Sequence, residues 1–494
     1  MLVAVFSRYY LLSVSYFYCH PYLVLMIYYL SHMGISRTTY FIGIGVYLLL
    51  ALFSILFYME RIVFLDCAFS VFHMAKDNSF SIQIFRFGDA FSRILPLLGV
   101  KLGLPLSVIS IAYSMGFIVF YFACYLLCGL YYRQYGYALV ILLVNILFVT
   151  DSFYWPTAQV PQAIALTMIL FSAIHAKQLR SISIATWLLI IALITTIVFF
   201  HPLMLAVLFY LIIFFMLGKK EDNTRTNVLL TLGLIYLGIL AIKMIFFRAE
   251  YERHSLSGLK NFVTLFPHYF NTYAVHNFLY SCLTKYYWIP ITFILVLVKY
   301  ITAKDYKKLL FFACVTIGYL MLVNTCYPNS ATPQFYIEVH YLPLGLFLGV
   351  PLVFDVLPFF SRQYVFALVL LIATSGAIRI YAAHDVYTQR LNWERAFLKK
   401  HGDKKMIVNS HKIDASALQM LWGTPYEFWL LSAIENHKLA SIIIDDNPKE
   451  REWANQKNKA LIVNWNVFPY STLNPLYFPI TDTITGYLID PDLE

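Results

Sequence analysis

Residues 40–66 read YFIGIGVYLLLALFSILFYMERIVFLD, an apolar run that ends abruptly in charged and aromatic residues. As a helix, the apolar part, 40–58, is long enough to cross the roughly 30 Å hydrocarbon layer of a membrane. Glu60, Arg61 and Asp66 follow it at once. In so apolar a chain, acids and bases gathered at a membrane boundary indicate a reaction or binding site.

The rest of the chain has the composition of a polytopic helical membrane protein. Of its 494 residues, 60% are hydrophobic and 13% are charged, and the mean hydropathy is +0.69. These three values lie outside the range that is typical of soluble domains. Ten further apolar stretches predict helical spans and not the short alternating strands of a barrel. With one or two helices in Met1–Leu30, the total is about 11–13 transmembrane helices. The ten stretches are 106–130, 137–150, 163–176, 182–200, 203–217, 228–247, 289–301, 309–324, 342–357 and 364–381.

The basic residues of the short loops predict the orientation. They fall on one side if the spans alternate, and that side is expected to face the cytoplasm. The opposite side then receives the outer loops 59–105, 151–162, 248–288 and 325–341, together with everything after residue 382. The net charge of +10 therefore indicates topology and contact with lipid head groups, and it does not indicate a nucleic-acid partner.

Beyond residue 382 the charge rises, and the pattern predicts a small α/β domain. Strands are expected at 405–409, 441–445 and 460–463, with a helix over 415–435. We therefore predict a transmembrane domain, 1–381, followed by an extracytoplasmic domain, 382–494, in a protein integral to the cell membrane.

The outer loop 59–105 contains two acidic candidate catalytic residues, Asp66 and Glu60. If Glu60–Met74 is one helix, Asp66, Ser70 and His73 fall at i, i+4 and i+7 and form a polar stripe facing away from Phe69. Such a helix would lie along the membrane surface. A carboxylate at this boundary suits a general base for a hydroxyl acceptor.

Three further charged residues of this loop have helical spacing. Arg86, Asp89 and Arg93 fall at i, i+3 and i+7, so the carboxylate can sit between two guanidinium groups. Arginines can hold the phosphates of a lipid-linked donor through forked contacts, and Arg61 is a further candidate. The alternative interpretation is an interfacial helix followed by a structural ion cluster.

Other outer-side residues fit a substrate-binding site. Aromatic and amide side chains suit stacking on sugar rings and bonding to their hydroxyls, and basic ones suit a phosphate. The same residues also occur in interfacial turns, as helix caps or as head-group anchors, so both interpretations stay open. Glu338 enters an apolar span almost alone, where an acid is costly unless paired. The candidates are Tyr154, Trp155, Gln159, Gln162, His201, Arg253, His254, Lys285 and Glu338.

The overall organisation resembles the GT-C superfamily of membrane glycosyltransferases. It shares an early span followed by a long hydrophilic loop with an acidic residue, around a dozen spans and a C-terminal outer domain. Several segments also resemble uncharacterised bacterial membrane proteins of this type. These segments are Ile94–Gly99, Ser152–Trp155, Pro161–Gln162 and Trp422–Trp429.

The resemblance implies a catalytic base at Asp66 and a polyprenyl-phosphate-linked sugar as donor. The loop lacks the paired-acid motif of better-known members, and no metal-ligand motif is present, so the cofactor is unassigned and a divalent cation is the candidate. We therefore expect inverting sugar transfer at the extracytoplasmic face, in cell-envelope glycan or lipid modification. Two alternatives remain: a transporter or flippase, and an assembly protein of the polysaccharide polymerase or ligase type.

Overall fold

A computed structural model describes residues 36–157, 159–176, 183–218, 223–247, 250, 256–402 and 404–489. Each of the eleven apolar stretches from 40–58 to 364–381 forms a helix. The helices expected in Met1–Leu30 lie outside the described residues. The described helices are α2 (Arg37–Leu56), α3 (Tyr58–Ile62), α4 (Leu65–Asp77), α5 (Ala90–Lys101), α6 (Leu106–Leu126), α7 (Tyr135–Leu147), α8 (Val160–Ala176), α9 (Ile184–Val198), α10 (Met204–Met216), α11 (Asn223–Phe246), α13 (Asn261–Thr264), α14 (Tyr273–Thr284), α15 (Trp288–Thr302), α16 (Tyr306–Cys326), α17 (Gln334–Pro351), α18 (Arg362–Ala382), α19 (His384–His401), α20 (Ala415–Leu418) and α21 (Thr424–Glu435).

Six of these helical segments are long and apolar enough to cross a membrane, or seven if the bent pair α14 and α15 forms one span. This is consistent with a membrane protein and is fewer than the 11–13 spans expected. The difference arises because α7, α8, α9 and α10 have 10–17 residues, whereas a full crossing needs about 20. Helices α7 and α8 are also almost completely buried by their neighbours.

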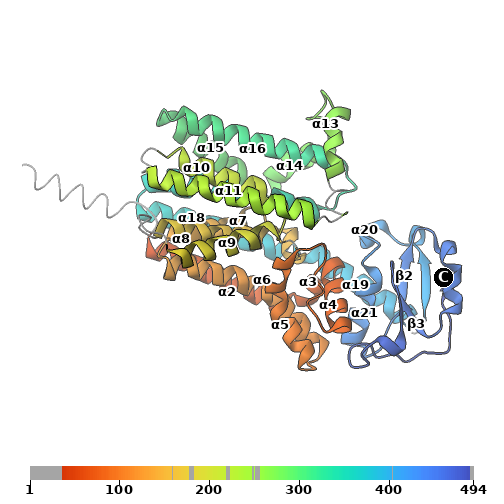
Figure 1. Ribbon diagram of the computed structural model, residues 1–494. Helices are drawn as coiled ribbons and strands as arrows, with labels where there is room; N and C mark the ends of the chain where they lie inside the picture. Colours follow the sequence, from red (N-terminus) through yellow and green to blue (C-terminus); the bar gives the residue numbers. More distant parts are fainter. Residues whose placement is uncertain are drawn as a thin grey trace, which may run out of the picture.

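The long helices run side by side in one bundle, and the C-terminal region lies beyond one end of it (Figure 1). Close packing in the bundle depends on small residues opposite aromatic ones. A Cβ atom added to Gly43 of α2 would lie 2.1 Å from the hydroxyl oxygen of Tyr125. Tyr125 stacks on Tyr40 with ring centroids 4.8 Å apart, so α2 and α6 approach closely where glycine leaves room.

The segment 59–105 does not form the single helix expected over Glu60–Met74. The helix α3 ends at Ile62, and Phe64 is extended before α4 begins at Leu65. Leu65 itself has a positive φ of 42°. Since this break separates Glu60 from Asp66, the two candidate bases lie on different helices.

The polar stripe expected on α4 is also incorrect, and Phe69, three residues after Asp66, lies on the same side of the helix as Asp66 and does not face away from it. Ser70 is 3% exposed and accepts a hydrogen bond from the guanidinium of Arg93. Phe69 is only half-buried and meets aromatic rings of the C-terminal region. The helix is therefore covered by α21 and α5 and does not have one free polar face.

The C-terminal region contains short strands as the sequence predicts. The strands are β1 (Met406–Asn409), β2 (Ile442–Asp445), β3 (Ala460–Ile462), β4 (Val467–Pro469) and β5 (Leu488–Ile489). Parallel pairing gives the order β2-β1-β5, and β3 and β4 form an antiparallel hairpin. The helix expected over 415–435 is split into α20 and α21. Helix α18 leads into α19 almost without a break, so this region is joined to the bundle by a nearly continuous helix.

A buried carboxylate joins α21, α19 and α4. Glu427 is 0% exposed, and its Oε1 accepts a hydrogen bond of 2.6 Å from the backbone N–H of Leu65. Its Oε2 pairs with the guanidinium of Arg390, which is itself 3% exposed. Arg390 also donates to the carbonyl oxygens of Ala417 and Leu418. This Glu427 clamp therefore fixes the C-terminal region against the start of the helix that bears Asp66.

We expect Glu427→Ala to lower the free energy of unfolding by about 3 to 5 kcal/mol, because it removes one of the two buried carboxylates that pair with Arg390, the other being Glu394, and leaves the Leu65 N–H without its acceptor. Thermal unfolding followed by tryptophan fluorescence in detergent micelles measures this. Glu435→Ala is the matched control, since it breaks the half-exposed pair with Arg395 and should cost less than about 1 kcal/mol. Equal losses in the two variants would contradict a special role for the clamp.

Candidate functional site

Asp66 lies in the first turn of α4 and is partly exposed. Its Oδ2 accepts a hydrogen bond of 3.0 Å from the indole N–H of Trp155. Burial raises the pKa of Asp66 to about 6, although the Trp155 hydrogen bond and the charge of Arg86 both act to lower it. At neutral pH the carboxyl group is therefore ionised and close to its pKa, as a general base requires.

Gln159 connects the charged residues that follow α4. Its side-chain oxygen accepts from Arg86 Nη1 at 2.8 Å, and its Nε2 donates to Asp89 Oδ1 at 3.1 Å. Asp89 also pairs with Arg93 Nη2 at 2.8 Å. The predicted linkage of Asp89 and Arg93 is thus confirmed, and an amide from the loop 151–162 bridges Arg86 to them.

Arg86 and Arg93 have different surroundings. Arg93 is 3% exposed, and its Nη1 donates to the carbonyl oxygens of Phe80 and Ser81 at 2.8 and 2.7 Å. Its terminal nitrogens are thus occupied by the protein, and the prediction that it binds substrate is not supported. Arg86 is half-buried and close enough to Asp66 to lower the pKa of that carboxyl group.

Two histidines lie near Arg86. His201, between α9 and α10, has its ring centroid 6.4 Å from that of His340 on α17. Burial, together with the charge of Arg86, holds the pKa of His201 well below its usual range. The ring is therefore neutral at physiological pH and can offer one donor and one acceptor. His201 was expected among the outer-side residues, whereas His340, which falls in the expected loop 325–341, was not singled out.

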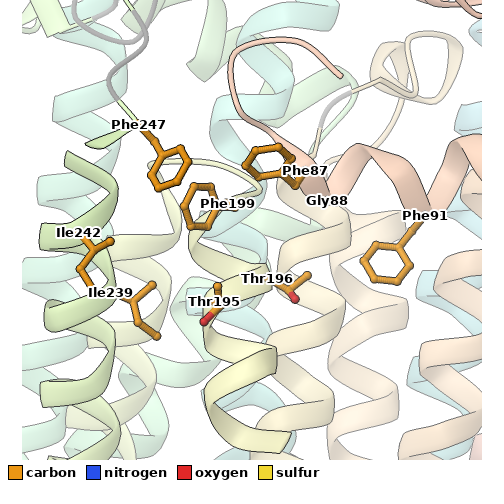
Figure 2. A pocket seen from close by; sticks show the side chains of 9 residues that line it. All are labelled: Phe87, Gly88, Phe91, Thr195, Thr196, Phe199, Ile239, Ile242 and Phe247. Atoms are coloured by element: carbon orange, nitrogen blue, oxygen red, sulfur yellow. The ribbon is translucent and has the colours of Figure 1, made fainter. Parts of the chain in front are cut away.

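An open apolar cleft of about 490 Å³ lies next to these charges. The rings of Phe87, Phe199 and Phe247 gather at one end of it, with Thr195, Thr196 and Ile239 further along (Figure 2). Phe87 and Gly88 line the cleft, and their sequence neighbours Arg86 and Asp89 belong to the polar network. The polar site and the cleft therefore share one segment of the chain.

Four of the predicted substrate-binding residues lie inside the protein. Arg61 and Tyr154 are at most 1% exposed; Arg61 donates to Ser114, and the Tyr154 hydroxyl donates to a backbone carbonyl of α18. Glu338 and Gln162 are 0% exposed. The amide atoms of Gln162 have no hydrogen-bond partner among the described residues. The expectation that these four residues contact the substrate directly is therefore not supported.

Glu338 is a structural residue. Its carboxylate accepts hydrogen bonds from the backbone N–H groups of Thr150, Asp151 and Ser152, and from the hydroxyls of Ser152 and Tyr286. Several charge-assisted bonds of this kind compensate for burying the acid. Glu338 thereby holds the loop that leads to Trp155.

The other predicted residues lie away from Asp66 or outside the described part of the chain. Glu60 accepts a hydrogen bond of 2.9 Å from Thr388 of α19. Lys285 pairs with Asp151 at 2.8 Å, beside the Glu338 network. Arg253 and His254 lie outside the described residues.

No family model, curated protein or solved structure matches this chain. Among the described residues, no group of three or more histidine, cysteine or acidic side chains could hold a metal ion. The function therefore has to be argued from the Asp66 site and the cleft beside it.

We predict that Arg86→Gln raises the pKa of Asp66 above about 6, because it removes a neighbouring cation that favours the carboxylate. The carboxyl C=O stretch, assigned from the infrared difference between wild type and Asp66→Asn, measures the titration. Arg37→Gln is the control, since Arg37 begins α2 and the segment 59–105 follows the other end of that helix. An unchanged titration in Arg86→Gln would contradict the proximity of the two charges.

Proposed function

We propose that the protein is a membrane glycosyltransferase that transfers a sugar from a polyprenyl-phosphate-linked donor to a hydroxyl acceptor at the extracytoplasmic face. The observation that carries this proposal is the position of Arg86, which directly precedes the cleft residues Phe87 and Gly88 and is close enough to Asp66 to lower the pKa of its carboxyl group. A lipid-linked sugar has an apolar chain, a phosphate and a sugar in sequence. The cleft, Arg86 and Asp66 offer apolar, cationic and carboxylate surfaces that match these three parts.

In the proposed reaction, the acceptor hydroxyl attacks the anomeric carbon of the donor sugar. The Asp66 carboxylate takes the hydroxyl proton as the new C–O bond forms. The bond from the anomeric carbon to the phosphate oxygen breaks, and Arg86 stabilises the departing polyprenyl phosphate. Trp155 orients the carboxylate through its indole hydrogen bond. One displacement of this kind inverts the anomeric configuration.

The cleft has the chemistry expected for the donor lipid. Its lining consists of aromatic and aliphatic side chains with the two threonines of α9. Phe87, Phe91 and Ile242 are 45%, 45% and 50% exposed, so apolar surface is available to a long hydrocarbon. Burying each CH₂ group of a lipid there contributes roughly 0.8 kcal/mol.

We expect Asp66→Asn to reduce the release of polyprenyl phosphate by about 100- to 10,000-fold, the range for loss of a general base. Purified protein with a pool of sugar-loaded polyprenyl-phosphate donors and varied hydroxyl acceptors provides the assay. Glu60→Gln is the matched control and should retain turnover, because Glu60 faces Thr388. Full turnover by Asp66→Asn would refute the general-base role, and no turnover by wild type would favour translocation or assembly.

We expect Thr196→Trp to raise the KM for a long-chain donor at least about tenfold while sparing a donor with a truncated lipid. An indole in the cleft would displace about two CH₂ groups, which corresponds to roughly a tenfold loss of affinity. Thr374→Trp is the control, since it fills a similar apolar groove of about 450 Å³ between α2 and α18. Equal effects of the two variants would argue against a specific lipid site at α9.

A further inference from the structure

An exposed aromatic cluster lies outside the residues used so far. Trp465, at the turn of the hairpin β3-β4, is 62% exposed. Its ring centroid is 5.3 Å from that of the partly exposed Trp422, with 30° between the ring planes. Phe69 of α4 meets both indoles edge-on, at centroid distances of 6.1 and 6.4 Å. We call Phe69, Trp422 and Trp465 the aromatic platform.

Hydrogen bonds hold the platform in shape. The side-chain amide of Asn464 donates to the carbonyl oxygen of Trp422 at 2.7 Å. The hairpin turn is closed by the bond from Val463 N–H to the Asn466 carbonyl oxygen at 3.0 Å. The backbone that bears both indoles is thus held in place, which lowers the cost of ordering this surface when a ligand binds.

The platform begins beside Asp66. A Cβ atom added to Gly423 would lie 2.9 Å from the Cα atom of Leu65, so these two backbones touch. Trp422 precedes Gly423, and Asp66 follows Leu65. Phe69 is three residues after Asp66 on the same helix, and side chains three apart lie on the same face. A molecule stacked on the platform would therefore extend toward the candidate base.

The chemistry of the platform favours a saccharide. The C–H groups on one face of a pyranose ring form an apolar surface that stacks on an aromatic ring, while its hydroxyls need polar partners at the rim. Polar groups lie next to Trp465 in the chain: the carbonyl oxygen of Asn464 accepts a hydrogen bond from Arg451 Nη2. The charge of Arg451 is already paired with Asp445, so this cation does not require a charged ligand.

We propose that Phe69, Trp422 and Trp465 bind the pyranose rings of a saccharide acceptor and present its terminal hydroxyl to Asp66. The acceptor role rests on the proposed glycosyltransferase function. Binding of a saccharide by the platform does not depend on catalysis, so the two proposals can be tested separately.

Titration calorimetry of the full-length protein in detergent micelles tests the platform. The probes are four neutral tetrasaccharides: β-1,4-linked glucose, β-1,4-linked N-acetylglucosamine, α-1,6-linked mannose and β-1,3-linked galactose. We expect at least one to bind wild type and to bind Trp465→Ala about tenfold more weakly, since an aromatic stacking contact contributes about that factor. Trp453→Ala, which removes another indole of the same region that is 44% exposed, should bind as wild type does.

Two results would overturn the proposal. One is that no probe binds wild type. The other is that Trp465→Ala binds the saccharide as tightly as wild type does; if that variant also adsorbs more weakly to anionic lipid vesicles, the indole belongs to the membrane interface.

The outcomes separate this proposal from the proposed function. Asp66→Asn should keep wild-type saccharide affinity. If wild type releases no polyprenyl phosphate but binds a saccharide through Trp465, the proposed transferase function is rejected and the proposed binding site is retained. If wild type releases polyprenyl phosphate and Trp465→Ala leaves the KM for the acceptor unchanged, the role of the aromatic platform is rejected and the transferase function is retained.

Discussion

The rest of the candidate site depends on one buried contact, the bond from the backbone N–H of Leu65 to the carboxylate of Glu427. Leu65 has the positive φ that lets the chain turn sharply between α3 and α4, a conformation that costs a non-glycine residue of order 1–3 kcal/mol. Glu427 and its partner Arg390 hold that turn from the C-terminal side. The position of Asp66 in the first turn of α4 is therefore set by residues more than three hundred positions later in the chain.

A second buried acid, Glu338, fixes the loop that brings Trp155 and Gln159 to the site. Glu338 gathers three consecutive backbone N–H groups and two hydroxyls around one carboxylate. The loop that it holds continues to Trp155, whose indole binds Asp66, and to Gln159, which binds Arg86 and Asp89. Two acids that touch no proposed substrate thus position the one acid that is proposed to act on it. Their burial is tolerated because each is paired or fully hydrogen-bonded.

Some features followed from local pattern, and others did not. The apolar stretches predicted the helices because long apolar runs form helices both in lipid and inside a bundle, whereas a short buried run such as Ile442–Ile444 forms a strand. The ion pair of Asp89 and Arg93 followed from helical spacing. The break after Ile62 was missed because residues 60–74 contain no proline or glycine. The turn is held by Glu427, which lies far away in the sequence. The buried positions of Tyr154 and Glu338 were missed because exposure depends on which helices lie alongside.

The sequence by itself determined the apolar helical character of the chain, the short strands near its end and the acidic residues Glu60 and Asp66 directly after an apolar run. These are local properties of composition and spacing. Only the tertiary structure decided that Trp155, Arg86 and Asp66 meet, that an apolar cleft opens beside them, and that Trp422 and Trp465 lie next to α4. These contacts join segments that are far apart in the chain, and a single sequence carries no local signal for them.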